Sequence, residues 1–293
     1  MKVLITGISG LLGQEISRAI ASGHDIIGLT QSSAGLGKTH FNVDISDQEA
    51  VYSTISKINP DIIIHSAALS NVDECETNPD KAMRVNALGT RNIALACQRF
   101  DTALVYISTD YAFSGTERNE KGFTEFDPIR PVSVYAQSKM HGEWFVQHLL
   151  NKFAIVRVSW LFGASRPNYV TQMADALLNK KEIIAVTDMV SAPTYVKDLA
   201  EALGQLIEKP SFGIYHLTNS GFASRYELAH TIADMMGAPK HFIKKSTLSE
   251  LKLKAQRPHF SGLRNYLWEL ENRQPLRPWQ DAVREFLATR NYL

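Results

Sequence analysis

The chain contains few cysteines and carries almost no net charge. Of its 293 residues, two are cysteines, Cys75 and Cys97. They are too few for a disulfide framework and lack the spacing of metal ligands, so we expect both to be small, buried apolar groups in a reducing compartment. The formal net charge of +1 gives no sign of a nucleic-acid or membrane-surface partner.

Long hydrophobic runs are lacking as well. No segment approaches the roughly 18 uninterrupted apolar residues of a membrane span. The chain starts with MKVLITG, which leads directly into a predicted strand and leaves no room for a signal peptide. We therefore expect a cytoplasmic protein, in which 44% hydrophobic residues build the core of one large domain or two smaller ones.

Short apolar runs alternate with helical periodicity over the first part of the chain. Strands are predicted at 2–7, 25–30, 61–68, 103–109 and 153–160, with helices at 11–23, 47–57, 79–99 and after Tyr135. The strands are almost continuously apolar, as expected when helices cover both faces of a parallel sheet. The pattern predicts an α/β fold with a doubly wound, Rossmann-like parallel sheet.

The later part of the chain has a different pattern. Helices are predicted at 168–180, 195–208, 224–236 and 278–289, mixed with short strands such as 213–218. We interpret residues 1–160 as a dinucleotide-binding domain and 161–293 mainly as a smaller α/β substrate lobe. Residues 187–218 are expected to return to the first domain.

The segment TGISGLLG places glycines at 7, 10 and 13 between the first strand and the first helix. Gly7 lets the chain turn, Gly10 lets the backbone approach a pyrophosphate, and Gly13 lets helix and sheet pack closely. The free N–H groups and dipole of the helix then favour the anion. A glycine-rich turn without such a role is the alternative, but the strand–loop–helix context favours dinucleotide binding.

The end of the second strand bears on the choice of cofactor. An NAD site usually places an acidic residue here for the ribose 2′-hydroxyl, yet no carboxylate occurs from Leu29 to Lys38. Ser32, Ser33 and Lys38 could instead receive a 2′-phosphate, which an acidic residue would repel. We therefore predict NADPH, and some enzymes of this kind also accept NADH.

Hydroxyl, phenol and ammonium groups are predicted to meet at one edge of the sheet. Ser108, Thr109 and Asp110 end a central strand, and Tyr135 and Lys139 lie one helical turn apart. Tyr135 could protonate a carbonyl oxygen that gains hydride, while Lys139 lowers the pKa of the phenol and Thr109 orients the substrate. The alternative is a helix-capping loop with an incidental lysine.

The motifs TGxxGxxG, HSAA, VNALGT, STDYAFSG and YAQSK together resemble those of the extended short-chain dehydrogenase/reductases. More narrowly, segments such as RVSWLFG, APTYVKDLA and QRPHFSGL are similar to the dTDP-4-dehydrorhamnose reductase family. The resemblance runs nearly end to end. It implies NAD(P)H-dependent reduction of the 4-keto group of a nucleotide sugar.

The resemblance also implies roles for individual residues. The catalytic triad would be Thr109, Tyr135 and Lys139, without a metal. The cofactor would contact Gly7, Ser9, Gly10, Leu11, Leu12, Gly13, Gln31, Ser32, Asp44, Ile45, Ala67, Ala68, Leu69, Asn86, Tyr135 and Lys139. The substrate would contact Asp110, Tyr111, Trp160 and Arg257. Trp160 as plain core and Arg257 as a surface ion pair are the alternatives.

Two segments depart from the family pattern. DMVSAPT has Met189 and Ser191 where the family usually has Gln and Gly, and GLRNYL after Ser261 lacks an expected acidic residue. Both changes put the exact sugar, and with it the nucleotide, in doubt. An epimerase or dehydratase of the same superfamily stays open, as does a non-catalytic subunit resembling the regulatory subunit of methionine adenosyltransferase. Family members often dimerise and some use Mg²⁺, so a homodimer and a Mg²⁺ requirement also stay open.

Overall fold

A computed structural model describes residues 1–31, 39–116 and 118–293. Its centre is a parallel sheet whose strand order matches a doubly wound arrangement, so the predicted fold class is confirmed. From edge to edge the strands are β11 (Gly213–His216), β6 (Phe153–Val158), β5 (Ala103–Thr109), β4 (Ile62–His65), β1 (Lys2–Thr6), β2 (Asp25–Thr30) and β3 (His40–Asn42).

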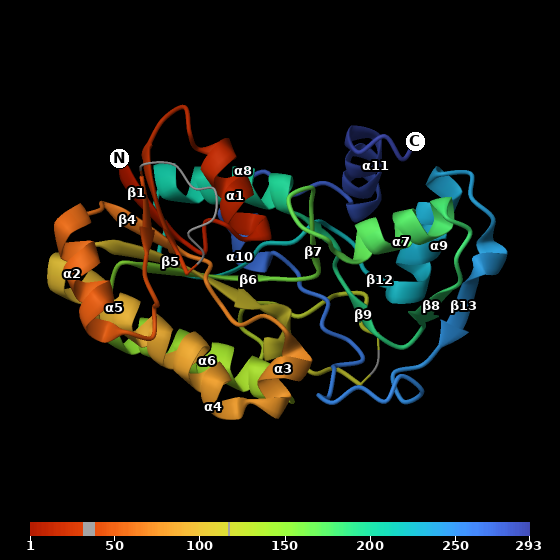
Figure 1. Cartoon of the computed structure of the whole chain (residues 1–293), viewed down its shortest axis with the longest axis horizontal. Helices are drawn as coiled ribbons and strands as arrows, with labels where there is room; N and C mark the ends of the chain where they lie inside the picture. The colour runs from red at the N-terminus through yellow and green to blue at the C-terminus, as the bar shows by residue number, and fades with distance from the viewer. Residues whose placement is uncertain (32–38, 117) are drawn as a thin grey trace.

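Helices cover both faces of this sheet (Figure 1). One face carries α1 (Leu11–Ala19) and α8 (Val196–Glu208), which pack on each other. The other face carries α2 (Gln48–Ile58), α5 (Gly89–Phe100) and α6 (Val134–Leu149). The strands are apolar throughout because neighbouring residues feed two cores: Ile62 and Ile64 pack on the first face, and Ile63 packs on the second.

The predicted long helix over 79–99 is interrupted in the structure. The segment consists of α4 (Pro79–Ala82), a π-helical turn η1 (Met83–Leu88) and α5, and a separate short helix, α3 (Val72–Thr77), precedes it. Hydrophobic periodicity does not reveal a single wide turn inside a helix, which is why the sequence predicted one element. The two cysteines lie in α3 and α5 and are free and buried, as predicted.

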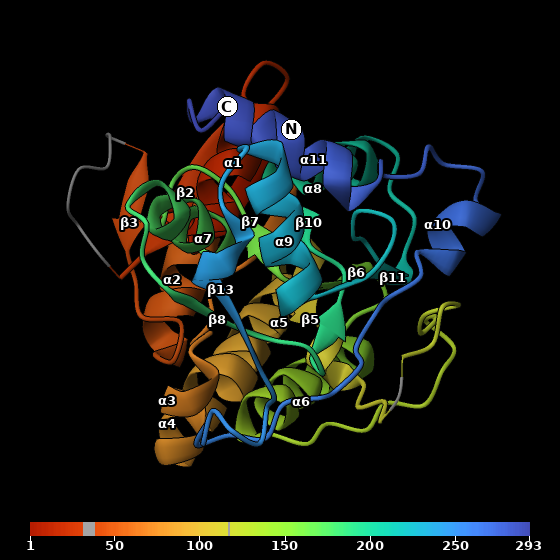
Figure 2. The ribbon, with the colours of Figure 1, turned by 90° about the vertical axis from the view of Figure 1, so that its right-hand side faces the viewer.

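The remaining elements form a second layer beside the carboxyl ends of the sheet strands, on the right of Figure 1. Its helices α7, α9 and α11 come to the front in Figure 2, whereas α10 packs beside β11 at the edge of the sheet. Their bounds are α7 (Tyr169–Leu178), α9 (Arg225–Met235), α10 (Tyr266–Leu270) and α11 (Trp279–Thr289), with 3₁₀ turns η2 (Asp110–Ala112) and η3 (Lys240–Phe242). Short strand pairs complete it: β7 (Leu161–Phe162) with β10 (Thr194–Tyr195), β9 (Val190–Ser191) with β12 (Ala223–Ser224), and β8 (Ile183–Val186) with β13 (Ile243–Ser246).

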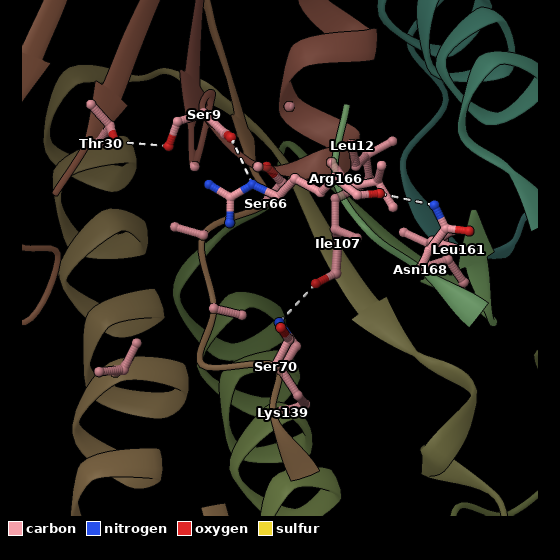
Figure 3. Close-up of a pocket in the computed structure, with 18 of the residues that line it drawn as sticks. Ser9, Leu12, Thr30, Ser66, Ser70, Ile107, Lys139, Leu161, Arg166 and Asn168 are labelled. Atoms are coloured by element: carbon pink, nitrogen blue, oxygen red, sulfur yellow. Dashed lines mark hydrogen bonds between the residues drawn. The ribbon is translucent and has the colours of Figure 1, made fainter. Parts of the chain in front are cut away.

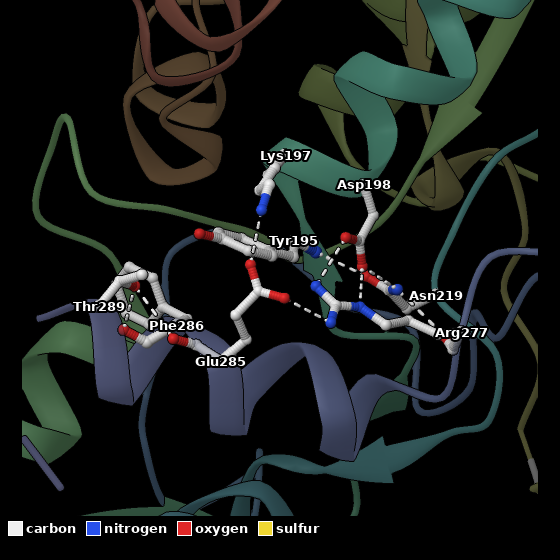
Figure 4. Close-up of polar contacts among 8 residues, drawn as sticks. All are labelled: Tyr195, Lys197, Asp198, Asn219, Arg277, Glu285, Phe286 and Thr289. Carbon is white, nitrogen blue, oxygen red and sulfur yellow. Dashed lines mark hydrogen bonds and ion pairs between the residues drawn. The ribbon is translucent and has the colours of Figure 1, made fainter. Parts of the chain in front are cut away.

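Ion pairs fasten the C-terminal helix to the sheet-covering helix α8 (Figure 4). Arg277 donates to both carboxylate oxygens of Asp198, at 2.8 and 2.9 Å, and to Glu285 at 2.6 Å. Glu285 also pairs with Lys197. The network joins α8 and α11, so the second layer is attached to the element that packs on α1.

The division at residue 160 stays a prediction.

Within the described ranges, no helix is long and apolar enough to cross a membrane.

Candidate functional site

A cavity of about 700 Å³ opens where the strands β1, β4, β5 and β6 end and the second layer begins (Figure 3). The glycine-rich loop after β1 forms one wall, and Tyr135 and Lys139 of α6 form another. Thirteen of the predicted site residues line it: Gly7, Ser9, Gly10, Leu11, Leu12, Gly13, Gln31, Ile45, Ala67, Ala68, Tyr135, Lys139 and Trp160. The structure therefore brings the predicted cofactor loop and the predicted catalytic pair together.

The glycine-rich loop leaves no space for side chains. Gly7 has φ +70°, and a Cβ atom there would lie 2.8 Å from the backbone nitrogen of Ala67. A Cβ atom on Gly13 would lie 2.3 Å from the carbonyl oxygen of Gly7. Gly10 is the N-cap of α1 and provides no side-chain hydrogen bond, so the N–H groups of the first turn are left for another acceptor. This cradle fits the diphosphate of a dinucleotide.

Ser9 and Gln31 line the next part of the cavity, and Asp44 lies behind Gln31 without lining it. Ser9 shares a 2.9 Å hydrogen bond with Thr30 at the end of β2 (Figure 3). Partial burial opposes ionisation of Asp44, but hydrogen bonds from Ser46 and Gln31 keep the pKa of its carboxyl below the usual value. Ser32, Ser33 and Lys38, the predicted contacts of a 2′-phosphate, lie outside the described residues.

Asn86 and Leu69 lie behind the cavity wall. The Leu69 N–H donates to the side-chain oxygen of Asn86 at 2.8 Å, and the Asn86 amide donates back to the Leu69 carbonyl and to the Ser138 hydroxyl, both at 3.0 Å. The π-helical turn carries Asn86. These bonds hold the loop that contains Ala67 and Ala68 against α6, so Asn86 and Leu69 support the cavity without lining it.

Tyr135 and Lys139 occupy the first two turns of α6. Ser133 caps this helix by accepting from the backbone N–H of Ala136. Lys139 Nζ donates to the Ile107 carbonyl at 2.8 Å (Figure 3) and lies 4.1 Å from the centre of the Tyr106 ring. Burial lowers the pKa of Lys139 to about 7.

The expected lowering of the tyrosine pKa is wrong for this structure. Burial raises the pKa of Tyr135 above its usual value, and a hydrogen bond with Thr109 only partly opposes this. The ammonium of Lys139 is itself desolvated and is bonded to Ile107. The phenol therefore keeps its proton at neutral pH, as a proton donor must.

Asp110 holds the hydroxyl side chains beside Tyr135. One of its carboxylate oxygens accepts from Ser159 at 3.0 Å, Ser191 at 2.9 Å and Ser261 at 2.5 Å, and the other accepts from Thr109 at 3.3 Å. Burial nevertheless raises the pKa of Asp110. Thr109 and Asp110 do not line the cavity. They form a buried polar cluster next to it, in which Asp110 fixes the hydroxyl of Thr109.

Tyr111, Trp160 and Arg257 were expected to contact the substrate. The Tyr111 ring meets the Tyr135 ring edge-on, with centroids 6.0 Å apart. Trp160 lines the cavity. Arg257 makes two hydrogen bonds of 2.8 Å to Asp73, but its side chain is largely buried beside Tyr111, so this is not a surface ion pair and a contact with the substrate stays a prediction.

Several cavity residues were missed by sequence reasoning. The Arg166 Nε donates to the Ser9 carbonyl at 3.2 Å and extends the guanidinium over the glycine-rich loop (Figure 3). Asn168 and Tyr169 begin α7, and Arg225 begins α9. Ser66 and Ser70 add hydroxyls, and so does Ser108, which the sequence did place at this edge of the sheet; among the described residues the buried Ser108 hydroxyl has no hydrogen-bond partner. No local motif marks Arg166, Asn168, Tyr169 or Arg225, because only the packing of the second layer brings them to the cavity.

Comparison with known proteins gives consistent matches over the whole chain. The family model described as RmlD substrate binding domain matches residues 1–291. A spore coat polysaccharide biosynthesis protein, SpsK, from Bacillus subtilis is 36% identical and covers 99% of this chain and 98% of the relative. A dTDP-4-dehydrorhamnose reductase from Streptomyces griseus is 34% identical over 96% of this chain and 91% of the relative.

Among solved structures, a dTDP-4-dehydrorhamnose reductase from Bacillus anthracis in complex with NADP has a TM-score of 0.91. It is 33% identical, and the alignment covers 98% of this chain and 99% of that one.

Proposed function

Because the chain belongs to the RmlD substrate binding domain family, we propose that it is an NADPH-dependent reductase that converts dTDP-4-dehydro-L-rhamnose into dTDP-L-rhamnose. The observation that carries the proposal is the shared cavity of the dinucleotide cradle, Tyr135 and Lys139. Relatives named dTDP-4-dehydrorhamnose reductase at 32–34% identity, and the NADP complex of a similar protein, support the substrate and the cofactor.

The residues divide the work of a carbonyl reduction. The bound dinucleotide supplies a hydride to the carbonyl carbon. Tyr135 donates its phenolic proton to the carbonyl oxygen as negative charge develops there. Thr109 lies behind the cavity wall, and its one hydroxyl proton would have to turn from Asp110 towards the same oxygen to orient it. Lys139 binds the ribose of the dinucleotide and stabilises the phenolate that Tyr135 leaves.

The residues that would hold the dinucleotide are those of the cradle and of the loop after β4. The N–H groups of the first α1 turn would bind its diphosphate, and Arg166 would add a positive charge on the other side. Ile45, Ala67 and Ala68 provide apolar cavity surface for the rings and riboses.

The composition of the cavity wall favours reduction over dehydration. A dehydratase needs additional acidic groups around the triad, whereas none of the described residues that line this cavity is acidic. Asp110 lies behind the wall with all its bonds directed to hydroxyls. The nucleotide-sugar substrate is part of this proposal. A homodimer stays a prediction.

The test is a direct assay. Mixing the protein with NADPH and dTDP-4-dehydro-L-rhamnose should consume the reduced nicotinamide, which is followed by its absorbance, and yield dTDP-L-rhamnose by mass spectrometry. Absence of NADPH oxidation would reject this substrate. A protein that purifies with tightly bound nicotinamide and converts the sugar without net consumption would instead be an epimerase.

A further inference from the structure

A second arginine of the cavity has no acidic partner. Arg225, the first residue of α9, lies in the cavity wall with its guanidinium carbon 3.6 Å from the centre of the Trp160 ring and 4.3 Å from that of Tyr169. Across the described ranges its guanidinium makes no hydrogen bond or ion pair; charges on Tyr169, Tyr111 and Asp110 act on it only through space. Burial lowers its pKa.

The carboxylate whose charge acts on Arg225, that of Asp110, is already engaged in hydrogen bonds. Asp110 accepts four hydrogen bonds from hydroxyls. A partly buried cation is costly unless an anion meets it, and the described residues provide no free anion here.

The conformation of Trp160 indicates that its stacking with Arg225 is a specific feature of the fold. Its backbone has φ +40°, a conformation that bulky side chains rarely adopt and that costs roughly 1–3 kcal/mol. Its indole N–H is buried and has no hydrogen-bond partner in the part of the chain that the structure describes. The strained residue places its ring under the guanidinium of Arg225, and a guanidinium stacked on rings keeps its edge available for bidentate bonds to phosphate.

We propose that Arg225 binds the diphosphate of the nucleotide-sugar substrate. The inference rests on the proposed function, because it takes the substrate to be a nucleoside diphosphate sugar. The substrate's diphosphate fits better than that of the cofactor because Arg225 lies on the wall formed by Trp160, α7 and α9. The cofactor cradle has its own cation, Arg166, bonded to the loop of Ser9.

The experiment compares the binding of two diphosphate ligands to the same variants. Arg225→Met keeps most of the aliphatic stem and removes the charge, and Arg225→Lys restores the charge without the planar fork. Calorimetric titration with dTDP should show affinity reduced roughly ten- to a hundred-fold in Arg225→Met, which is the range for losing charged hydrogen bonds, and partly restored in Arg225→Lys. Titration with NADPH should be unchanged in both.

Arg166→Gln is the matched control because it removes from the same cavity the guanidinium that bonds the glycine-rich loop. It should weaken NADPH and leave dTDP binding as it is. Unchanged dTDP affinity in Arg225→Met would overturn the proposal. Equal losses for dTDP and NADPH, together with a lower melting temperature, would also overturn it, since they would indicate a structural role.

The wild-type protein is titrated with UDP and GDP as well, which separates this inference from the proposed function. If wild type binds UDP or GDP but not dTDP, the proposed substrate is wrong. Loss of that other diphosphate in Arg225→Met would still support the role of Arg225. If wild type binds none of the three nucleoside diphosphates, both proposals fail.

Discussion

The two halves of the cavity are built on different principles. The cofactor half consists mainly of backbone, provided by the loops that follow β1 and β4, and its glycines exclude side chains. The half proposed for the substrate, called the substrate half, consists of side chains: Trp160, Tyr169 and Arg225 line it, and Asp110 with its serines lies behind them. The first is set by a few consecutive residues, whereas the second depends on segments far apart in the chain.

This difference suggests how each half can change. A backbone cradle binds any ligand with the same diphosphate and gives little opportunity for specificity. A cluster of side chains can be altered one residue at a time, and the family departures Met189 and Ser191 lie in this half. Substitutions should therefore separate the two halves by the ligand whose binding they affect.

The largest effect is expected where the two halves meet. Tyr135→Phe should lower turnover by about 10²- to 10⁴-fold because the reaction loses its proton donor. Since the ring remains, the dissociation constants of NADPH and dTDP should stay within about two-fold. Stopped-flow kinetics with calorimetry measure both quantities, and Tyr52→Phe on the exposed surface of α2 is the control. Near-normal turnover in Tyr135→Phe would remove the tyrosine from the reaction.

A methyl group in the cradle should separate the halves more clearly. In Gly13→Ala the new Cβ would lie 2.3 Å from the Gly7 carbonyl oxygen and 2.7 Å from Ile8 Cα, and backbone atoms cannot move aside cheaply. We expect a loss of roughly 1–3 kcal/mol in unfolding free energy and NADPH affinity lowered about ten-fold, with dTDP affinity nearly unchanged.

Gly23→Ala makes the same chemical change where a Cβ would have no atom within 4 Å. Its unfolding free energy in urea should differ from wild type by less than about 0.5 kcal/mol. If the two variants behave alike, close packing at Gly13 is not what the cradle requires.

The same division separates the features that the sequence predicts from those that it does not. The sheet strands and the cradle were predicted because apolar runs and glycine spacing are local signals. The convergence of Ser159, Ser191 and Ser261 on Asp110 was not, since Asp110 and Ser261 are 151 positions apart. Ser191 was noted as a departure, but its partner was not foreseeable.

The pKa of Tyr135 was mispredicted for a related reason. Sequence spacing placed an ammonium nearby but gave no measure of burial, which turned out to be the dominant influence. Arg225 had no local signal at all, because its relation to Trp160 exists only after the second layer has packed.

The smallest effect is expected for Ser191→Ala in the substrate half. The variant loses one of the hydroxyls that donate to Asp110, while Ser159 and Ser261 remain. We expect about 1 kcal/mol less unfolding free energy at neutral pH, a few-fold higher KM for the nucleotide sugar, and unchanged NADPH affinity.

The pH dependence of this loss of unfolding free energy shows whether Ser191 acts by stabilising the charge of Asp110. Burial already raises the pKa of Asp110 above its unfolded value of 3.8, so folding favours the protonated acid, and stability falls as the pH rises from 3.8 through the folded pKa. The serine hydroxyl stabilises the carboxylate, and removing it raises the folded pKa further. The destabilisation by Ser191→Ala, measured by urea unfolding, should therefore be larger at neutral pH than near pH 3.8. An equal loss at both pH values would mean that Ser191 contributes by packing and not by stabilising the charge of Asp110.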